Sequence, residues 1–520
     1  MGSSLNRWLV SHRPFASRLT VTLIVLRRQI IVFVALGSLT YGYSASIIAT
    51  TLGQPSFIAY FDLDTRANAN SLIGAVNGLF QAGGLIGTLC CSFFADRLGR
   101  RKAILIAAVT TVVGGALQAG SVAIEMYIVM RLITGMGIGA LVTLVPIYQS
   151  EISPPEIRGL LVGMHGVLIC VGYTSSSWIG LGFYFVNAAG AQWRIPLAIQ
   201  CIWPLLLAAG IMYLPESPRW LLTKDKHDQA FQAFSRTRAN AAGHELQSDF
   251  ALLEEQVRLE LNADPSWMDF VRQPGLRKRC IIGFLTMFGA QGTATLVINN
   301  YGPSLYSALG FGTVQQLLIQ SGWISVCPFG NWVNALVVDK IGRTRLLMFG
   351  FGGCVVALIG ECITVSIYQR TGDRAASSAA VFFLFFHILW SVVPSNSQAH
   401  MKAWYSSFSS SVDATSYIYA SEIFPTPARA KGMSISVSGL FIATIIFLQA
   451  APTAFAAIGW KYYVVFVVIT SVLFVVVWIW FPETKKQSLE DVGLLFNDAP
   501  KADFEHKEFA EVEGHGAAKQ

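Results

Sequence analysis

Two groups of charged residues recur along the chain at matching positions. The segment Asp96–Arg101 recurs as Asp339–Thr344, and the segment Glu151–Pro154 recurs as Glu422–Pro425. Arginine and carboxylate side chains at helix ends can form ion pairs that close one face of a helical protein and break when that face opens. A repeat on this scale predicts two homologous halves, and a site between two such halves is typical of secondary transporters.

These charged groups border apolar runs that are long enough to cross a membrane. Hydrophobic residues make up 53% of the 520 residues, charged residues only 13%, and the mean hydropathy is +0.52. So little charge argues against an ordinary soluble domain. We expect an all-α membrane protein with twelve transmembrane helices in two pseudo-symmetric bundles of six. The apolar runs lie near residues 30–50, 71–95, 103–121, 122–148, 160–187, 195–214, 280–301, 315–337, 346–368, 432–456 and 460–481, with an irregular one around 378–421.

The composition divides the chain into five regions. They are a leader (1–28), a first bundle (29–214), a polar linker with amphipathic helices (215–279), a second bundle (280–481) and a tail (482–520). Arginines of the leader and of the loops after helices two and eight fall on one side, which predicts cytoplasmic amino and carboxyl termini. This asymmetry accounts for the net charge of +7, so the charge does not indicate a nucleic-acid partner.

No residue pattern indicates an enzyme, a metal site or a cofactor. Seven of the eight cysteines lie inside apolar runs and the eighth, Cys280, lies at the edge of one, without metal-ligand spacing. The chain shows no Ser-His-Asp arrangement and no glycine-rich phosphate loop, which also argues against an ATP-driven pump. Packing is the simplest role for these cysteines.

The two halves differ in length at one place. Asp96 and Glu151 are 55 positions apart, whereas Asp339 and Glu422 are 83 apart. The surplus lies where helix ten is expected, in a polar, serine-rich stretch. Polar backbone at membrane depth is tolerated only where it lines a cavity or is buried in protein. We interpret His387–Ser406 as an insertion, either genuine or a retained intron in the gene model, and a transcript sequenced across it distinguishes the two.

Together these motifs resemble the sugar porter family of the major facilitator superfamily, in its fungal branch of hexose and sugar transporters. The resemblance covers about residues 30–485. The motifs that carry it are Asp96-Arg97-x-Gly99-Arg100-Arg101, Arg131-x3-Gly135-x-Gly137-x-Gly139, Pro146-x-Tyr148-x2-Glu151-x2-Pro154-x3-Arg158-Gly159, Pro215-Glu216-Ser217-Pro218-Arg219, their second-half copies, and Pro482-Glu483-Thr484.

The resemblance implies that the repeated charges are gate residues that set the balance between inward-open and outward-open states. The alternative is that the arginines serve only to orient the helices in the membrane. The first-half gate residues are Asp96, Arg97, Arg100, Arg101, Glu151, Arg158, Glu216 and Arg219, and those of the second half are Asp339, Arg343, Glu422 and Arg429. Gly135, Gly137 and Gly139 are expected to let neighbouring helices approach closely.

Proton coupling is left open by the sequence. In proton-coupled sugar porters the intramembrane Arg131 is expected to pair with an aspartate in helix one, but this chain has Gly42-Tyr43-Ser44 there. That difference favours facilitated diffusion. Against it stands Asp413, an acid inside the irregular helix ten near His387, because a buried carboxylate can carry a proton. Asp413 as a helix cap near a break is the alternative.

The substrate site departs from the family pattern. Amide side chains suit sugar hydroxyls because each hydroxyl both donates and accepts. Four amide positions of the family are Gly166, Ala290, Leu296 and Leu440 in this chain. The remaining substrate-binding candidates are Gln291, His165, Thr295, Asn299, Asn300 and Tyr417, with Asn331 or Asn334 on helix eight as further possibilities.

These observations favour a carrier that moves a sugar or similar small polyhydroxylated solute by alternating access, as a uniporter or a proton symporter. The same fold adapted to a polyol, a quinate-like acid or a secondary metabolite is the alternative. A sugar sensor that does not transport is a third hypothesis, and the short tail after Pro482 argues against it. The expected partners are the solute, the lipid bilayer of the plasma membrane and, under symport, protons. No oligomer is indicated.

Overall fold

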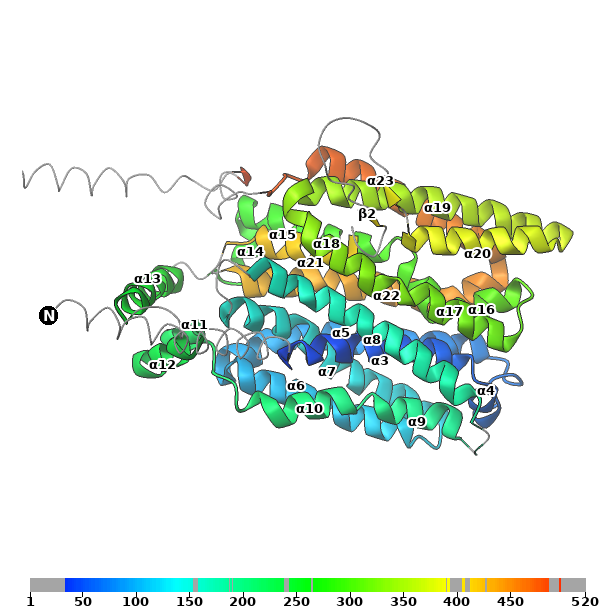
Figure 1. Ribbon diagram of the computed structural model, residues 1–520, viewed down its shortest axis with the longest axis horizontal. Helices are drawn as coiled ribbons and strands as arrows, with labels where there is room; N and C mark the ends of the chain where they lie inside the picture. Colours follow the sequence, from blue (N-terminus) through cyan, green and yellow to red (C-terminus); the bar gives the residue numbers. More distant parts are fainter. Residues whose placement is uncertain are drawn as a thin grey trace, which may run out of the picture.

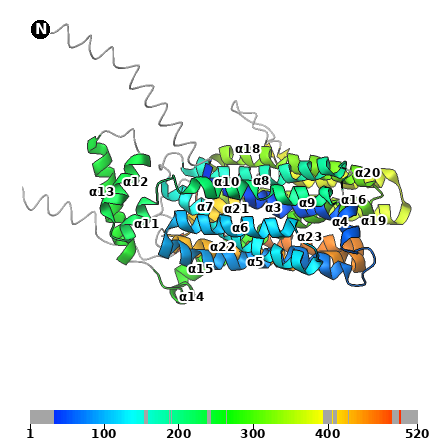
Figure 2. The ribbon, with the colours of Figure 1, turned by 90° about the horizontal axis from the view of Figure 1, so that it is seen from below.

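Most of the described chain lies in helices that run side by side along one long axis (Figure 1). The computed structural model describes residues 33–152, 158–186, 188, 190–237, 243–262, 265–389, 391–392, 405–406, 412–425, 428–485 and 495–496. Three short helices, α11 (Pro218–Thr223), α12 (His227–Thr237) and α13 (Gly243–Asn262), stand off one end of the bundle (Figure 2). We call this the linker end and the opposite one the distal end.

The first bundle contains six passes, one of which is interrupted. A short helix, α4 (Pro55–Tyr60), follows the first pass at the distal end. The passes are α3 (Leu36–Leu52), α5 (Ala69–Leu98), α6 (Arg100–Ala119), α7 (Ile124–Ile152), α8 (Arg158–Tyr184), and α9 (Ala191–Ile199) continued by α10 (Ile202–Ile211).

The second bundle, as far as it is described, repeats this layout with more interruptions, so that the described helices give the twelve passes expected. It is preceded by α14 (Asp269–Arg272). Its passes are α15 (Pro274–Gln291) with α16 (Thr295–Ala308), α17 (Thr313–Ser325) with α18 (Cys327–Ile341), α19 (Arg343–Thr371), α20 (Arg374–Leu389) with α21 (Ala414–Glu422), α22 (Arg429–Ile458), and, after the 3-10 turn η4 (Gly459–Lys461), α23 (Tyr462–Trp480).

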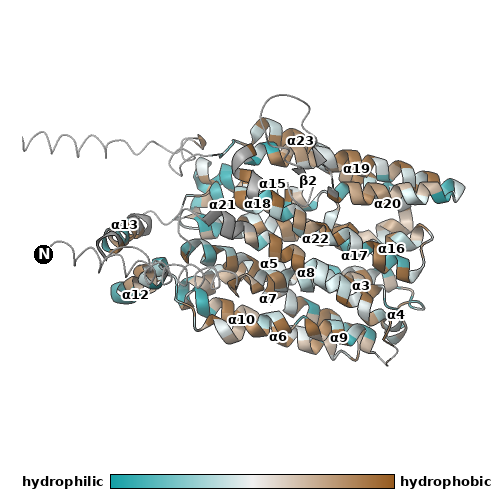
Figure 3. Cartoon of the chain, in the orientation of Figure 1, coloured by the Kyte–Doolittle hydropathy of each residue, from teal (hydrophilic) through white to brown (hydrophobic). Residues whose placement is uncertain are grey.

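The outer surface of the helices suits a lipid environment. By length and composition, eight stretches of the described helices are apolar enough to cross a membrane, and the last of these joins α22 and α23. Apolar residues cover the outward faces, and hydrophilic residues gather at the linker end (Figure 3). Trp478 and Ile479 are 69% and 73% exposed, which is costly in water but favourable against lipid tails.

Glycines allow α5 and α7 to pack backbone against backbone. A Cβ atom on Gly135 would lie 2.1 Å from the carbonyl oxygen of Phe80, and one on Gly139 would lie 2.0 Å from that of Gly84. Gly137 faces α6 instead, where a Cβ would meet the Thr111 hydroxyl at 2.3 Å. The close helix approach expected from this motif is confirmed.

Three passes of the second bundle are interrupted, and two of the interruptions have an unusual backbone. Between α15 and α16, Ala294 adopts a left-handed conformation with φ of 69°, which a residue with a Cβ rarely adopts. Between α20 and α21, a two-residue strand β1 (Ser391–Val392) pairs antiparallel with β2 (Tyr405–Ser406). His387, the first residue of the expected insertion, belongs to α20, and most of the residues from there to Ser406 lie outside the described ones.

Candidate functional site

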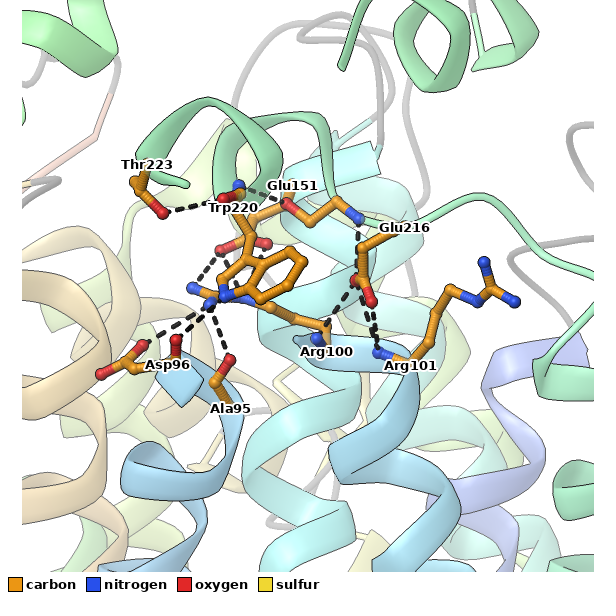
Figure 4. Close-up of polar contacts among 9 residues, drawn as sticks. Ala95, Asp96, Arg100, Arg101, Glu151, Glu216, Trp220 and Thr223 are labelled. Atoms are coloured by element: carbon orange, nitrogen blue, oxygen red, sulfur yellow. Dashed lines mark hydrogen bonds and ion pairs between the residues drawn. The ribbon is translucent and has the colours of Figure 1, made fainter. Parts of the chain in front are cut away.

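An ion-pair network joins three elements of the first bundle at the linker end (Figure 4). The Arg100 guanidinium, at the start of α6, donates from Nε to Glu151 Oε2 and from Nη2 to Glu151 Oε1, both at 3.0 Å. It also lies 3.5 Å from Asp96 on α5. The Arg100 and Glu151 side chains are only 11% and 13% exposed, so solvent screens this bidentate pair weakly.

Glu216 closes the same network by capping a helix. Its carboxylate accepts the backbone N–H groups of Arg100 at 3.1 Å and of Arg101 at 3.3 Å, where α6 begins and the helix dipole favours negative charge. Gly99, with φ of 91°, makes room for it, because a Cβ there would lie 2.6 Å from Glu216 Oε2. Burial raises the pKa of Glu216 above its usual range, although the N–H groups of Ser217 and Arg101 and the nearby arginine charges act to lower it.

The second bundle repeats the network. Arg343 donates from Nε to Glu422 Oε2 at 3.0 Å and from Nη2 to Glu422 Oε1 at 2.8 Å. Glu483 accepts the backbone N–H groups of Arg343 at 2.8 Å and Thr344 at 3.2 Å, and the Thr344 hydroxyl at 2.6 Å. A Cβ on Gly342, where φ is 113°, would lie 2.6 Å from Glu483 Oε2. Burial acts to raise the pKa of Glu483, but these hydrogen bonds outweigh it and hold that pKa below its usual range.

Two residues of the second network, Glu483 and Thr484, are not among the predicted gate residues. Thr484 donates to Glu422 Oε2 at 2.9 Å, so both residues belong to the second network. The signal was present, because Pro482-Glu483-Thr484 repeats Pro215-Glu216-Ser217. The tyrosines match as well: Tyr148 donates to the Pro215 carbonyl and Tyr419 to the Pro482 carbonyl.

The other gate candidates take different positions. Arg97 lies over the Phe93 ring, 4.2 Å from its centroid, and Arg101 donates to the Met212 carbonyl. Arg219 and Arg429 belong to the described chain and have interaction partners there. The side chains of Arg158 and Asp339 lie outside the described residues.

A small cavity lies between the two bundles where α15 gives way to α16. Its volume is about 30 Å³. Three of the substrate-binding candidates, Gln291, Thr295 and Asn299, line it together with Asp413, which was expected to bind protons. The other lining residues are Cys170, Tyr173, Ala290, Leu296, Ile324 and Cys327.

The remaining candidates stand behind or beside this cavity. His165 hydrogen-bonds the Ser38 hydroxyl at 2.6 Å and meets the Tyr417 ring edge to face, with 5.4 Å between ring centroids. The Asn300 amide donates at 2.8 Å to the Leu296 carbonyl of its own helix. Asn331 donates to Cys170 Sγ at 2.9 Å.

Asn334 lies further along α18, where its amide donates to the Thr415 hydroxyl at 3.1 Å. His387 bonds the Thr293 carbonyl at 2.9 Å, at the break between α15 and α16. Neither side chain is among those that line the cavity.

Known proteins share this architecture and these motifs. A family model described as "Sugar (and other) transporter" matches residues 30–496. The chain belongs to the sugar transporter family. It is 30% identical to the MFS-type transporter criB of Aspergillus cristatus, over 90% of this chain and 92% of that protein. It is 28% identical to a high-affinity glucose transporter of Kluyveromyces lactis, over 90% and 85% of the two chains.

The fold of this transporter also matches a solved structure. The proton:xylose symporter XylE bound to 6-bromo-6-deoxy-D-glucose superposes with a TM-score of 0.74 at 22% identity, over 91% of this chain and 99% of that one. This likeness confirms the expected major facilitator fold of two six-helix bundles.

Arg131 of the transporter is buried among backbone carbonyls. Its Nη1 donates to the Ser44 carbonyl at 3.0 Å and its Nε to the Val76 carbonyl at 3.4 Å. The guanidinium also lies over the Phe80 ring, 4.2 Å from its centroid. The contact with residue 44, where the resemblance expects an aspartate, is therefore made by the backbone.

Asp413 is placed at the start of α21, as the alternative interpretation required, but its side chain makes no capping hydrogen bond. The Cys170 thiol instead donates to Asp413 Oδ2 at 4.0 Å. A partly exposed carboxylate that lines the cavity and leaves its own helix uncapped is suited to bind a proton or a donor group of the solute.

Proposed function

We propose that the cavity between the bundles is the solute site of a sugar carrier that works by alternating access. The observation that carries this proposal is the convergence of Gln291, Thr295, Asn299 and Asp413 on one cavity between α8, α15, α16 and α21. Amide and hydroxyl groups can both donate to and accept from solute hydroxyls. A cavity of about 30 Å³ is too small for a hexose, so binding of a hexose requires the bundles to separate.

The chemistry of the cavity favours a neutral solute. Asp413 is the one charged group among its described lining residues, and a carboxylate would repel an anion in a low-dielectric site. This argues against the quinate-like acid. A polyol remains the second candidate, because four amide positions of the family are apolar or small here and fewer hydroxyls can be satisfied.

The two linker-end networks are proposed to close the cytoplasmic side of the carrier. Each joins the start of one helix to the end of a neighbouring one through Arg100–Glu151 or Arg343–Glu422. Opening of this side would require such pairs to separate or rearrange. In this proposal both termini are cytoplasmic and the plasma membrane is the site of action, with a transport role and no catalysis.

Asp413 is proposed to take up the proton in a sugar–proton symport. It lines the solute cavity, and the partner of Arg131 at residue 44 is a carbonyl that cannot titrate. A proton on Asp413 would remove a negative charge from the cavity between the bundles during the step in which the loaded carrier reorients.

The test is uptake of labelled glucose into a host that lacks its own hexose carriers, with external pH recorded. Saturable uptake with external alkalinisation supports sugar symport, and saturable uptake without it supports a uniporter. A carrier that inserts correctly but moves no hexose would shift the assignment to the polyol, and a panel of labelled polyols then follows.

A further inference from the structure

A second, larger cavity lies at the distal end, away from the residues that line the solute cavity. Its volume is about 210 Å³. Asn70 and Ile73 of α5 line one side, and residues of α16, α19, α22, η4 and α23 line the rest, so it lies between the two bundles. Roughly 150 Å³ is enough for benzene in a protein interior, so this cavity has room for a small organic molecule.

One carboxylate at the floor of this cavity has an oxygen without a hydrogen-bond partner in the described part of the chain. Glu361, in the distal half of α19, is only 2% exposed. Its Oε2 makes no hydrogen bond to any described residue. A buried charge without a partner is costly, and a bound cation would remove that cost.

The rest of the lining is aromatic or neutral. Phe455, Trp460 and Tyr463 line the cavity with Tyr301, and Phe455 meets Tyr463 edge to face with 5.6 Å between ring centroids. None of the described lining residues is Lys, Arg or His. Aromatic faces attract cations through the ring quadrupole, most strongly where water is excluded.

The mouth of the cavity is accessible while its floor is not. Asn70, Ser304 and Gln369 are exposed, whereas Glu361 and Tyr463 are buried. A ligand could therefore reach the carboxylate from the distal end. A hard metal ion would require several oxygen ligands close together, whereas a carboxylate among aromatic rings fits an alkylammonium group.

We propose that this cavity binds a small organic monocation, with its ammonium group paired to Glu361 and surrounded by Phe455, Trp460 and Tyr463. The sequence analysis had not included Glu361. The site lies outside the solute cavity, so the inference does not depend on which solute is carried.

The test uses a matched pair of probes on the full-length protein in lipid nanodiscs, in an amine-free buffer. Choline and 3,3-dimethylbutan-1-ol have nearly the same shape, but only choline is charged. Calorimetric titration is expected to show saturable binding of choline and at least roughly tenfold weaker binding of the alcohol, because only choline pairs with the buried carboxylate. Equal binding of the two, or no binding of choline, would overturn the proposal.

Two variants and one control assign the binding to this cavity. Glu361→Gln is expected to weaken choline binding roughly tenfold or more, because it removes the charge and keeps the shape. Trp460→Leu should weaken it about fivefold through the lost aromatic face, which provides a second test should the first variant fold poorly. Glu125→Gln, an exposed position at the start of α7, should bind choline like the unaltered protein. Unchanged binding in both cavity variants would also overturn the assignment.

Discussion

At the scale of single residues, three of the four polar groups proposed to contact the solute lie where helices break, and the fourth, Asn299, lies one turn into α16. Gln291 is the last residue of α15, Thr295 the first of α16, and Asp413 immediately precedes α21. Helix breaks free backbone groups and direct side chains inward, which is tolerated at membrane depth only around a cavity. The same breaks allow these side chains to move when the bundles rearrange.

Replacement of Gln291 by alanine should weaken solute uptake at least about tenfold, because an amide partner lost from a buried hydroxyl costs roughly 1–3 kcal/mol. The measurement is the concentration dependence of uptake, with surface expression checked for each variant. Asn300→Ala is the comparison, since the Asn300 amide already donates a hydrogen bond to the Leu296 carbonyl of its own helix. A larger loss of uptake with Asn300→Ala than with Gln291→Ala would show that Asn300, and not Gln291, is the residue that binds the solute.

Asp413→Asn should separate sugar movement from proton movement. The amide keeps the shape of the carboxylate but binds no proton, so external alkalinisation during uptake should disappear while exchange of sugar across the membrane persists. Uptake by the unaltered carrier should fall as external pH rises, and that of the variant should stay flat. Asp373→Asn, an exposed acid before α20, is the control. Unchanged external alkalinisation with Asp413→Asn would show that Asp413 does not take up the transported proton.

At the scale of elements, each half carries the same arrangement at its linker end, which we call the joint. A glycine with positive φ precedes a helix, the arginine at the start of that helix pairs with a glutamate, and a second glutamate caps the same helix. The repeat predicted the Arg100–Glu151 and Arg343–Glu422 pairs because charge type and spacing recur in the sequence. The roles of Glu216 and Glu483 as caps depend on backbone N–H groups, which no side-chain pattern displays. The Asn300 amide likewise bonds a backbone carbonyl, that of Leu296, and its role as a solute ligand stays a prediction.

The elements also explain what the sequence could not reveal about cavities. Twelve apolar runs predicted the passes, and Gln291 could be selected as an amide within one of them. The left-handed Ala294 that divides α15 from α16 has no signal of its own, because alanine is an ordinary helix residue. Glu361 was hidden in an otherwise apolar run, and only the packing of α16, α19 and α23 around it reveals its cavity.

The two capping glutamates should respond differently to substitution by glutamine. Because the pKa of Glu483 is lowered in the folded state, its contribution to stability is present above the unfolded-state pKa and is lost as pH falls through the folded-state value. Burial raises the pKa of Glu216 in the folded state above its pKa in the unfolded state. The stability of the protein therefore falls as pH rises from the unfolded-state pKa through the folded-state pKa of this residue.

At pH 7, Glu483→Gln should therefore lower the free energy of unfolding by about 1 kcal/mol, a modest value because this carboxylate is partly exposed. Glu216→Gln should leave the stability unchanged or increase it. Thermal unfolding of the purified variants between pH 4 and pH 8 measures both, and the Glu483→Gln deficit should shrink toward pH 4. An equal loss at pH 7 in both variants would contradict the assigned pKa directions.

Arg100→Ala should act on turnover rather than on solute affinity, because the residue lies far from the solute cavity in a network at the linker end. We expect kcat for uptake to change about tenfold and KM to stay within about twofold, as for a shifted equilibrium between states. Arg97→Ala is the matched control, since that guanidinium lies over Phe93. A large rise in KM with unchanged kcat would count against gating.

At the scale of the whole molecule, the two bundles are held together by contacts toward the distal end. Asn77 donates to the Tyr301 hydroxyl, which in turn donates to the Leu448 carbonyl, both at 2.9 Å. On the other side, Trp178 donates to the Ser325 hydroxyl at 2.9 Å. A glycine on α5 permits this closure, because a Cβ on Gly74 would lie 2.7 Å from the backbone carbonyl oxygen of Gln449 on α22.

Gly74→Val should therefore keep the bundles apart at the distal end and slow transport several-fold. A cysteine at Asn77 in a cysteine-free background should react faster with a membrane-impermeant thiol reagent when Gly74→Val is present. Gly352→Val is the control, because a Cβ there meets its nearest neighbour, Phe474, at an ordinary 3.6 Å. Equal labelling rates in the two variants would show that distal closure does not depend on this glycine.

The matched joints of the two halves also bear on the ancestry of the molecule. Glu216 lies beyond the last helix of the first bundle and Glu483 beyond the last helix of the second, yet each folds back onto its own half. The ancestral gene that was duplicated therefore encoded six helices together with the short Pro-Glu-Ser/Thr segment that follows them. A half-length ancestor of this kind would have carried a complete joint, with its arginine–glutamate pair and its capping glutamate, before the two copies were fused. Each copy has kept its own joint.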